Sequence, residues 1–208
     1  MGWHSRGYLP HLDAAKEIQA VTFRLADALS AMVIERWQRE LENVGQETDE
    51  NQRAKRLHGW IARYEDAGHG ACVLQQSQCA EIVQSALLHF DGDRYRMLEW
   101  VIMPNHVHMM LETLPGYELA GVIKSWKSFT ARRIHDAIGG SGPLWQREYF
   151  DRYIRDENHF HASRKYIHEN PVKAGLVAQA EDWRWGSASQ QRSAGFAGSA
   201  SNDTKKPV

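Results

Sequence analysis

Two strand-like segments follow one another almost directly in the middle of the chain, and this pair constrains the fold more than any other feature. Residues 94–103 are rich in Tyr, Leu, Trp, Val and Ile, and residues 106–112 read HVHMMLE. Only Pro104 and Asn105 separate the two segments. A link this tight joins antiparallel strands, because parallel neighbours need a long crossover connection. The pair therefore predicts an antiparallel hairpin.

Periodicity and turn residues divide the rest of the chain into further strands and helices. Residues 18–25 predict a strand, and residues 71–74 a short one. The expected helices cover residues 30–41, 56–66, 77–90, 119–138 and 156–170. Ser77 and Asp156 are the expected N-caps, and Pro171 is expected to end the last helix. Loops are expected at residues 1–16 and 45–55. Strands that alternate with helices, two of them tightly linked, predict an α/β (α+β) fold. We expect helices packed on an antiparallel sheet and not a doubly wound parallel sheet.

The length of 208 residues fits a single domain. We expect that domain over residues 1–188, with a helical insertion at about 30–70, followed by a disordered tail at 189–208 that is rich in small and polar residues. No stretch approaches the roughly 20 apolar residues of a membrane span, and no apolar signal region is visible. Cys72 and Cys79 are too few for a disulfide framework. We therefore expect a cytoplasmic protein without a membrane partner.

Charge is unevenly distributed along a chain whose formal net charge is only −1. Residues 119–175 contain ten Lys and Arg but six Asp and Glu. This local excess of positive charge suggests a face for an anionic partner, but on charge alone a solvated helix face is the favoured explanation.

Two pairs of residues carry the chemistry. His106 and His108 lie two apart on a predicted strand, so both imidazoles project from one face and form half of a divalent metal site. Tyr166 and Asn170 lie four apart on a predicted helix and therefore share a face. An amide oxygen can bind a metal, and a phenol can attack a phosphate that the same metal polarises. A coincidental histidine pair and a solvent-facing polar stripe are the alternatives.

These residues lie within longer runs that point to one family. The run at 98–111, LEWVIMPNHVHMML, resembles the metal-binding strand of one-tyrosine HUH single-strand transposases. Similar runs occur at 8–13 (YLPHLD), 21–27 (VTFRLAD), 123–131 (IKSWKSFTA), 144–155 (LWQREYFDRYIR) and 166–177 (YIHENPVKAGLV). Together they resemble the REP-associated tyrosine transposases, which are IS200-like transposases linked to repetitive extragenic palindromes. The resemblance spans about residues 6–188 and is looser across 30–70.

The resemblance implies a ferredoxin/RRM-like HUH nuclease core and a specific chemistry. His106, His108 and Asn170 match the family's ligands for Mg²⁺ or Mn²⁺, and Tyr166 matches its nucleophile. The implied activity is cleavage and rejoining of single-stranded DNA hairpins through a 5′-phosphotyrosine intermediate. No nucleotide cofactor is needed, because the phosphotyrosine conserves the bond energy. We expect a monomer rather than a dimer, associated with the nucleoid when it binds DNA.

A further set of residues is expected to contact DNA, through phosphate charge, base stacking or reading of an unpaired guide sequence by the N-terminal arm. The set consists of His11, Arg24, Lys124, Trp126, Lys127, Arg132, Arg133, Trp145, Arg147, Arg152, Arg155 and Lys165. Lys165 is in addition a candidate for assisting the phenol of Tyr166, and Trp126 has the core as its alternative place.

Three other functions remain in view. One is a DNA hairpin-binding protein with a domesticated transposase fold that has lost cleavage. Such a protein would not need all four active residues, so their presence argues against it. An unrelated metallohydrolase would need more His or Asp ligands near the histidine pair than the sequence offers. A replication initiator or relaxase uses HUH chemistry as well, but such proteins are typically larger.

Overall fold

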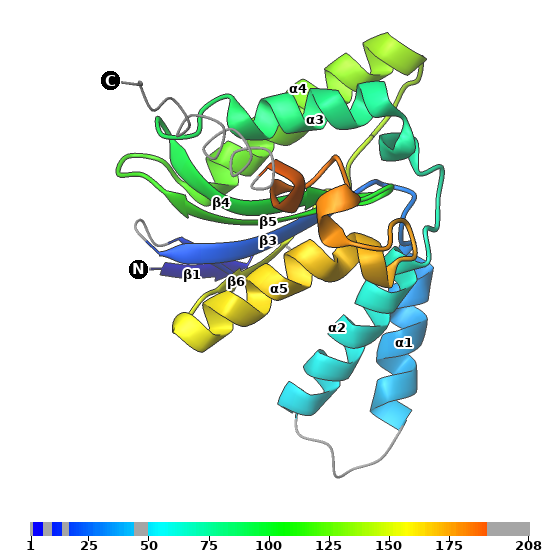
Figure 1. Cartoon of the computed structure of the whole chain (residues 1–208). Helices are drawn as coiled ribbons and strands as arrows, with labels where there is room; N and C mark the ends of the chain where they lie inside the picture. The colour runs from blue at the N-terminus through cyan, green and yellow to red at the C-terminus, as the bar shows by residue number, and fades with distance from the viewer. Residues whose placement is uncertain (1, 6–9, 14–16, 44–49, 191–208) are drawn as a thin grey trace, which may run out of the picture.

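The computed structural model describes residues 2–5, 10–13, 17–43 and 50–190 (Figure 1). Its centre is a four-stranded antiparallel sheet in the order β4-β5-β3-β6. The strands are β3 (Ile18–Arg24), β4 (Tyr95–Ile102), β5 (His106–Thr113) and β6 (Phe150–Tyr153). Helix α3 (Ser77–Leu88) connects β3 to β4, and α4 (Leu119–Ile138) connects β5 to β6. This βαββαβ order is the ferredoxin-like arrangement, so the predicted fold class is confirmed.

The sheet is covered on both faces. Figure 1 shows α3 and α4 side by side on one face and α5 (Glu157–Lys173) on the other. Along β5, Val107, Met109 and Leu111 belong to the larger core beneath α3 and α4, whereas Met110 belongs to the smaller core beneath α5. Side chains alternate between faces along a strand. His106 and His108 consequently face α5 together with Met110.

The two-helix insertion projects from the end of the sheet, between β3 and α3 in the chain. It consists of α1 (Ala31–Asn43) and α2 (Glu50–Asp66), which pack against each other (Figure 1). A separate two-stranded sheet is formed by β1 (Gly2–Ser5) and β2 (Pro10–Asp13), and β2 lies beside β6. Within the described residues, no helix is both long and apolar enough to cross a membrane. The expected tail lies almost entirely beyond residue 190 and is outside the described residues.

Several expected boundaries are wrong. Residues 71–74 form no strand, because Cys72 adopts a left-handed conformation (φ 49°) and a 3-10 helix, η1 (Val73–Gln75), follows it. The first helical residue of α2 is Glu50, inside the expected loop. The N-cap of α3 is Gln76, not Ser77, and it makes no side-chain capping bond. The expected cap at Asp156 is confirmed, since its Oδ1 accepts a hydrogen bond from the His159 amide at 2.8 Å.

The last helix also extends further than expected. Pro171 does not end α5, which continues to Lys173. A Schellman motif closes the helix: Gly175 adopts φ 69°, its amide donates to the Val172 carbonyl, and the Leu176 amide donates to the Pro171 carbonyl. The proline removes one intrahelical hydrogen bond, which its N–H would have donated to the Ile167 carbonyl. This extension keeps Asn170 inside the helix, where its side chain is fully buried.

Candidate active site

His106 is held in one tautomer at the start of β5. The Asn105 amide nitrogen donates to the His69 carbonyl at 2.9 Å, which fixes the orientation of that amide. The Asn105 oxygen therefore faces His106 Nδ1, 2.7 Å away, and accepts its hydrogen. The lone pair of the imidazole is thereby left on Nε2, a buried atom for which the described residues offer no hydrogen-bond partner.

His108 lies beside it on the same face. The two ring centroids are 4.5 Å apart. On β3, Thr22 is the residue opposite His108, and its Oγ1 lies 2.6 Å from His108 Nδ1. Thr22 and Asn105 thus orient the two rings through their Nδ1 atoms, as outer-shell partners do for metal-binding histidines.

Helix α5 brings Tyr166 and Asn170 to these histidines. The ring centroids of Tyr166 and His108 are 5.2 Å apart, and the two ring planes meet at an angle of 74°. Asn170 follows one helical turn later, and neither polar atom of its buried amide has a hydrogen-bond partner among the described residues. Leaving such atoms unsatisfied costs free energy, so a ligand is expected to occupy them.

The electrostatics of the site favour neutral imidazole. Burial, and secondarily the nearby His108 and Arg24, lower the pKa of His106 well below 6.5. Neutral imidazole is the form that binds metal ions. Among the residues that the structure describes, no three His, Cys, Asp or Glu side chains are grouped to hold a metal. A divalent ion here would use two imidazoles and the amide oxygen of Asn170, and the unsatisfied atoms of His106 and Asn170 fit that role.

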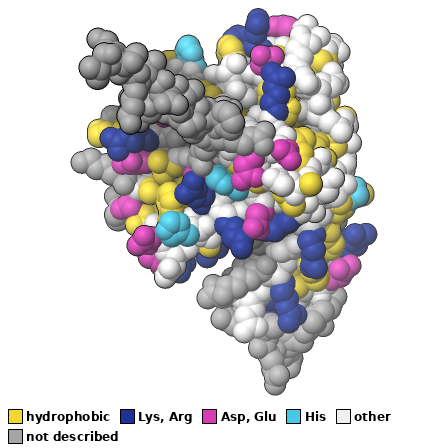
Figure 2. All heavy atoms as spheres, in the orientation of Figure 1, with side chains coloured by type: hydrophobic (Ala, Val, Ile, Leu, Met, Phe, Trp, Pro, Cys, Tyr) yellow, Lys and Arg dark blue, Asp and Glu magenta, His cyan; other side chains and the backbone are white. Residues whose placement is uncertain are grey.

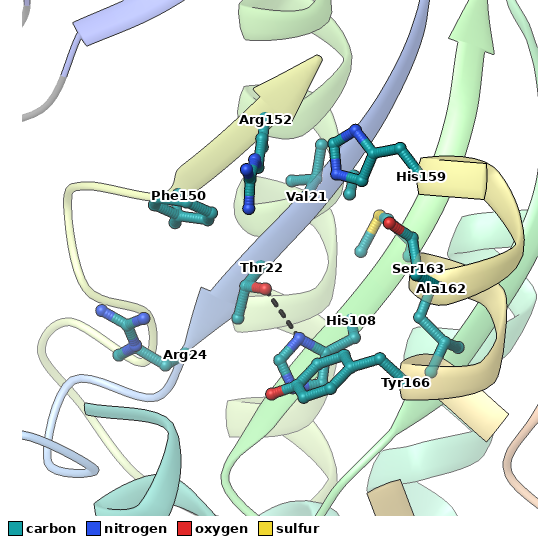
Figure 3. A pocket seen from close by; sticks show the side chains of 13 residues that line it. Val21, Thr22, Arg24, His108, Phe150, Arg152, His159, Ala162, Ser163 and Tyr166 are labelled. Carbon is teal, nitrogen blue, oxygen red and sulfur yellow. Dashed lines mark hydrogen bonds between the residues drawn. The ribbon is translucent and has the colours of Figure 1, made fainter. Parts of the chain in front are cut away.

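A pocket of about 330 Å³ opens next to His108, between α5 and the β3–β6 edge of the sheet (Figure 3). Arg24 and Arg152 line it together with Phe150, and α5 contributes His159, Ser163 and Tyr166. Figure 3 shows the Tyr166 ring lying across His108, with its hydroxyl directed toward the side on which Arg24 lies. The two guanidinium groups and the phenol suit a phosphodiester.

The structure separates the predicted DNA-contacting residues into groups. Arg24 and Arg152 line the pocket. Arg147 and Arg155 are exposed, and Lys165 is exposed beside Glu169, with 3.6 Å between their charged atoms. On the face with α5, Figure 2 shows basic side chains interspersed with acidic ones. Three of the predicted residues are exposed on α4, which covers the opposite face of the sheet from the pocket; they are Lys124, Arg132 and Arg133.

Three of the residues predicted to contact DNA are engaged in contacts within the protein. Trp126 is 3% exposed and donates to the Tyr95 hydroxyl, and Trp145 is 6% exposed and donates to Thr130 Oγ1, so both rings belong to the core. The Lys127 amine donates to three backbone carbonyls, at residues 146–148, at 3.1–3.2 Å. Burial lowers the pKa of this amine to about 8. A lysine held in this way supports the loop before β6.

Some predicted and unpredicted residues need separate mention. His11 belongs to β2, but its side chain lies outside the described residues. Sequence reasoning missed Thr22 and Asn105, although Asn105 directly precedes the histidine pair. It also missed Lys173, whose amine lies 5.4 Å from the centre of the Tyr166 ring and pairs with Glu169 at 3.2 Å.

Comparison with known proteins finds similarity to one family. The family model described as "Transposase IS200 like" matches residues 73–170, the segment that contains both histidines, Tyr166 and Asn170. This segment, just under half of the chain, is therefore similar to the IS200-like transposases. The resemblance noted from the sequence runs is thereby confirmed.

Curated relatives of this chain carry more specific names. A REP-associated tyrosine transposase of Escherichia coli K12 is 28% identical over 104 residues, which are 50% of this chain and 61% of the relative. A putative REP-associated tyrosine transposase of Haemophilus influenzae is 28% identical over 100 residues, which are 41% of this chain and 54% of the relative. The matched part therefore spans less than two thirds of either relative.

A solved structure shares the fold. It is described as a REP-associated tyrosine transposase bound to a REP hairpin, and the superposition has a TM-score of 0.54 at 19% sequence identity. The match covers 94% of this chain and 87% of the solved chain. The likeness thus extends beyond residues 73–170 to most of the architecture.

Proposed function

We propose that this transposase is a metal-dependent endonuclease and strand transferase for single-stranded DNA, which recognises hairpins like those of repetitive extragenic palindromes. The observation that carries the proposal is the contact of the Tyr166 ring with His108 at the pocket, with the buried Asn170 one turn further along α5. A nucleophile placed beside a candidate metal site is what phosphoryl transfer through a covalent enzyme intermediate requires.

The metal would be Mg²⁺ or Mn²⁺, held by His106, His108 and Asn170. Mixed imidazole and amide ligands suit Mn²⁺, whereas cellular availability favours Mg²⁺. When bound, the ion would polarise a non-bridging oxygen of the scissile phosphate. Asn105 and Thr22 orient the two imidazoles for this role through hydrogen bonds of 2.7 and 2.6 Å.

The phenol oxygen of Tyr166 is the proposed nucleophile. It forms a bond to phosphorus while the bond to the 3′ oxygen breaks, and the leaving 3′ oxygen takes up a proton as the phenol gives one up. The products are a 5′-phosphotyrosine and a free 3′-hydroxyl. Attack of a 3′-hydroxyl on the phosphotyrosine reverses the step and joins strands. A free phenol, with a pKa of about 10, is a weak nucleophile at neutral pH, so the cations near α5 are candidates to assist it.

The DNA itself would enter along the pocket. Arg24 and Arg152 line the pocket and would contact phosphates of the DNA backbone, and the Phe150 ring would offer a surface for a base. The hairpin as the ligand is suggested by the relative whose structure was solved with a REP hairpin. We propose a monomer as the acting unit.

A denaturing gel tests the proposal. The protein is incubated with end-labelled single-stranded palindromes from the flanks of its own gene, with Mn²⁺ or Mg²⁺, beside Tyr166→Phe and an EDTA control. We expect cleavage and a covalent protein–DNA band that both controls abolish. Binding to several hairpins without cleavage in either metal would instead establish the non-catalytic hairpin-binding protein.

A further inference from the structure

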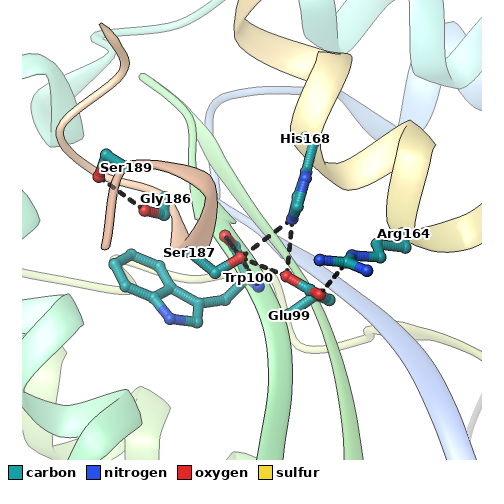
Figure 4. Close-up of polar contacts among 7 residues, drawn as sticks. All are labelled: Glu99, Trp100, Arg164, His168, Gly186, Ser187 and Ser189. Atoms are coloured by element: carbon teal, nitrogen blue, oxygen red, sulfur yellow. Dashed lines mark hydrogen bonds and ion pairs between the residues drawn. The ribbon is translucent and has the colours of Figure 1, made fainter. Parts of the chain in front are cut away.

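A buried acidic residue outside the proposed site connects three elements of the fold. Glu99 on β4 is 4% exposed. Its Oε1 accepts from Arg164 Nε at 2.8 Å, and its Oε2 accepts from His168 Nε2 and from Ser187 Oγ, each at 2.7 Å (Figure 4). Two of these partners lie on α5, on either side of Tyr166 in the sequence.

A β-bulge directs Glu99 toward α5. The register of β4 and β5 shifts between Met97, which pairs with Leu111, and Glu99, which pairs with Met110. The extra residue, Leu98, reverses the alternation of side chains, so Leu98 and Glu99 both face α5. Without the bulge, Glu99 would point into the apolar core beneath α3 and α4. Bulges commonly re-aim a side chain in this way next to active sites.

Helix geometry turns this contact into control of the nucleophile. Successive residues of a helix are separated by about 100°, so Arg164 and His168 share one flank of α5, and Tyr166 and Asn170 share the other. Ile167, which is 3% exposed, lies between the flanks and packs against the sheet. Rotation of α5 about Ile167 would move Tyr166 away from His108 and withdraw Asn170. Glu99 opposes that rotation by holding the far flank.

The segment after α5 completes the arrangement. Ser187 Oγ donates to Glu99 and also accepts from the Trp100 amide at 3.1 Å. The Ile102 amide donates to the Trp185 carbonyl at 2.8 Å, so this segment is fixed along the outer edge of β4. Ser187 is 6% exposed, and its position determines which oxygen of Glu99 remains for Arg164.

We propose that Glu99, assisted by Ser187, is a positioning residue that sets the rotation of α5 and thereby aligns Tyr166 and Asn170 with the histidine pair. The inference rests on the proposed function for the identity of the nucleophile and the third ligand. Its partners Arg164, His168 and Ser187 neither line the pocket nor belong to the candidate metal ligands, so through them Glu99 acts on the helix.

The test compares Glu99→Gln and Ser187→Ala with a matched control, Arg96→Ala. Arg96 forms a β4–β5 ion pair with Glu112 at 3.4 Å, but its side chain is 65% exposed. For each variant we measure the rate of covalent adduct formation at saturating hairpin DNA, the Kd for that DNA, and amide hydrogen exchange in α5 and α4. Arg164→Ala and Arg164→Lys form a second pair, in which the lysine keeps the charge.

We expect Glu99→Gln to lower the rate of adduct formation by roughly 10- to 100-fold, because a misplacement of about 1 Å costs this much, while the Kd stays unchanged. Exchange should accelerate in α5 and not in α4, Arg96→Ala should match the wild type, and Arg164→Lys should recover part of the rate that Arg164→Ala loses. Unchanged exchange in α5, or an unchanged rate, would overturn the inference. If the wild-type protein forms no adduct, the proposed function fails, and hydrogen exchange alone then decides the role of Glu99.

Discussion

Replacing Thr22 by Val tests whether the strand next to β5 tunes the histidine pair. Thr22 is 9% exposed and lies opposite His108, with 2.6 Å between Oγ1 and Nδ1. Valine keeps the branched shape that suits a β-strand and replaces the hydroxyl by a methyl group. The change therefore deletes the hydrogen bond without opening a cavity.

The magnitude follows from what the hydroxyl does. Removing one partner of a buried hydrogen bond costs about 1–3 kcal/mol, so the free energy of unfolding should fall within that range. Loss of an outer-shell partner typically weakens metal binding by about 10- to 100-fold. On this reasoning Thr22→Val lowers both the free energy of unfolding and the affinity for Mn²⁺. The loss of Mn²⁺ affinity should be larger than a general destabilisation of the strand would cause.

Urea unfolding and calorimetric titration with Mn²⁺ measure the two effects. Thr113→Val is the matched control, because Thr113 is also buried, at 4% exposure, but lies at the far end of β5. The control should bind Mn²⁺ as the wild type does. If Thr22→Val loses stability yet binds Mn²⁺ with wild-type affinity, the assignment of Thr22 as an orienting partner of a metal ligand is wrong.

Three further results are expected. Burial lowers the pKa of Lys127 from 10.5 to about 8, so the unfolded chain binds more protons than the folded chain between pH 8 and 10.5. The free energy of unfolding should therefore rise with pH over this interval relative to Lys127→Met. Urea titrations at several pH values measure this rise. Burial acts to raise the pKa of Glu99, but the hydrogen bonds from His168 and Ser187 and the charges of His168 and Arg164 outweigh it, so the pKa lies below 4.5. The free energy of unfolding should therefore decline as the pH falls below 4.5, and it should decline less steeply in Glu99→Gln. Arg152→Ala should weaken hairpin binding and reduce the slope of log K against log salt by about one, measured by fluorescence anisotropy, and an unchanged slope would remove Arg152 from the DNA path.

The sequence sufficed for the elements whose pattern is local. The strands around Pro104 and Asn105 and the helix at 119–138 match their predicted positions, because alternation and helical spacing are set by neighbouring residues. β6 was not anticipated, since Phe150–Tyr153 is a short edge strand that contains two charged residues. It forms only because β3 offers a free edge, and this pairing is not local in sequence.

The candidate site shows the same division. Spacing on a strand and on a helix brought His106, His108, Tyr166 and Asn170 into one hypothesis, and the structure places Tyr166 against His108. Spacing gives no such signal for Thr22 and Glu99. The role of Thr22 depends on the strand opposite it, and that of Glu99 depends on a register shift. The one available hint was a glutamate within the apolar run LEWVIM at residues 98–103. The burial of Trp126 and Trp145 likewise depends on tertiary packing.

The measurement that tests the central claim most directly is the mapping of the covalent DNA adduct by mass spectrometry after digestion with trypsin. The three tyrosines near the site fall in different peptides, because Arg147, Arg152, Arg155, Lys165 and Lys173 separate Tyr149, Tyr153 and Tyr166. We expect a nucleotide attached through phosphate to the peptide of residues 166–173, in which Tyr166 is the only tyrosine. An adduct on Tyr149 or Tyr153, or cleaved DNA without any protein adduct, would contradict the assignment of Tyr166 as the nucleophile.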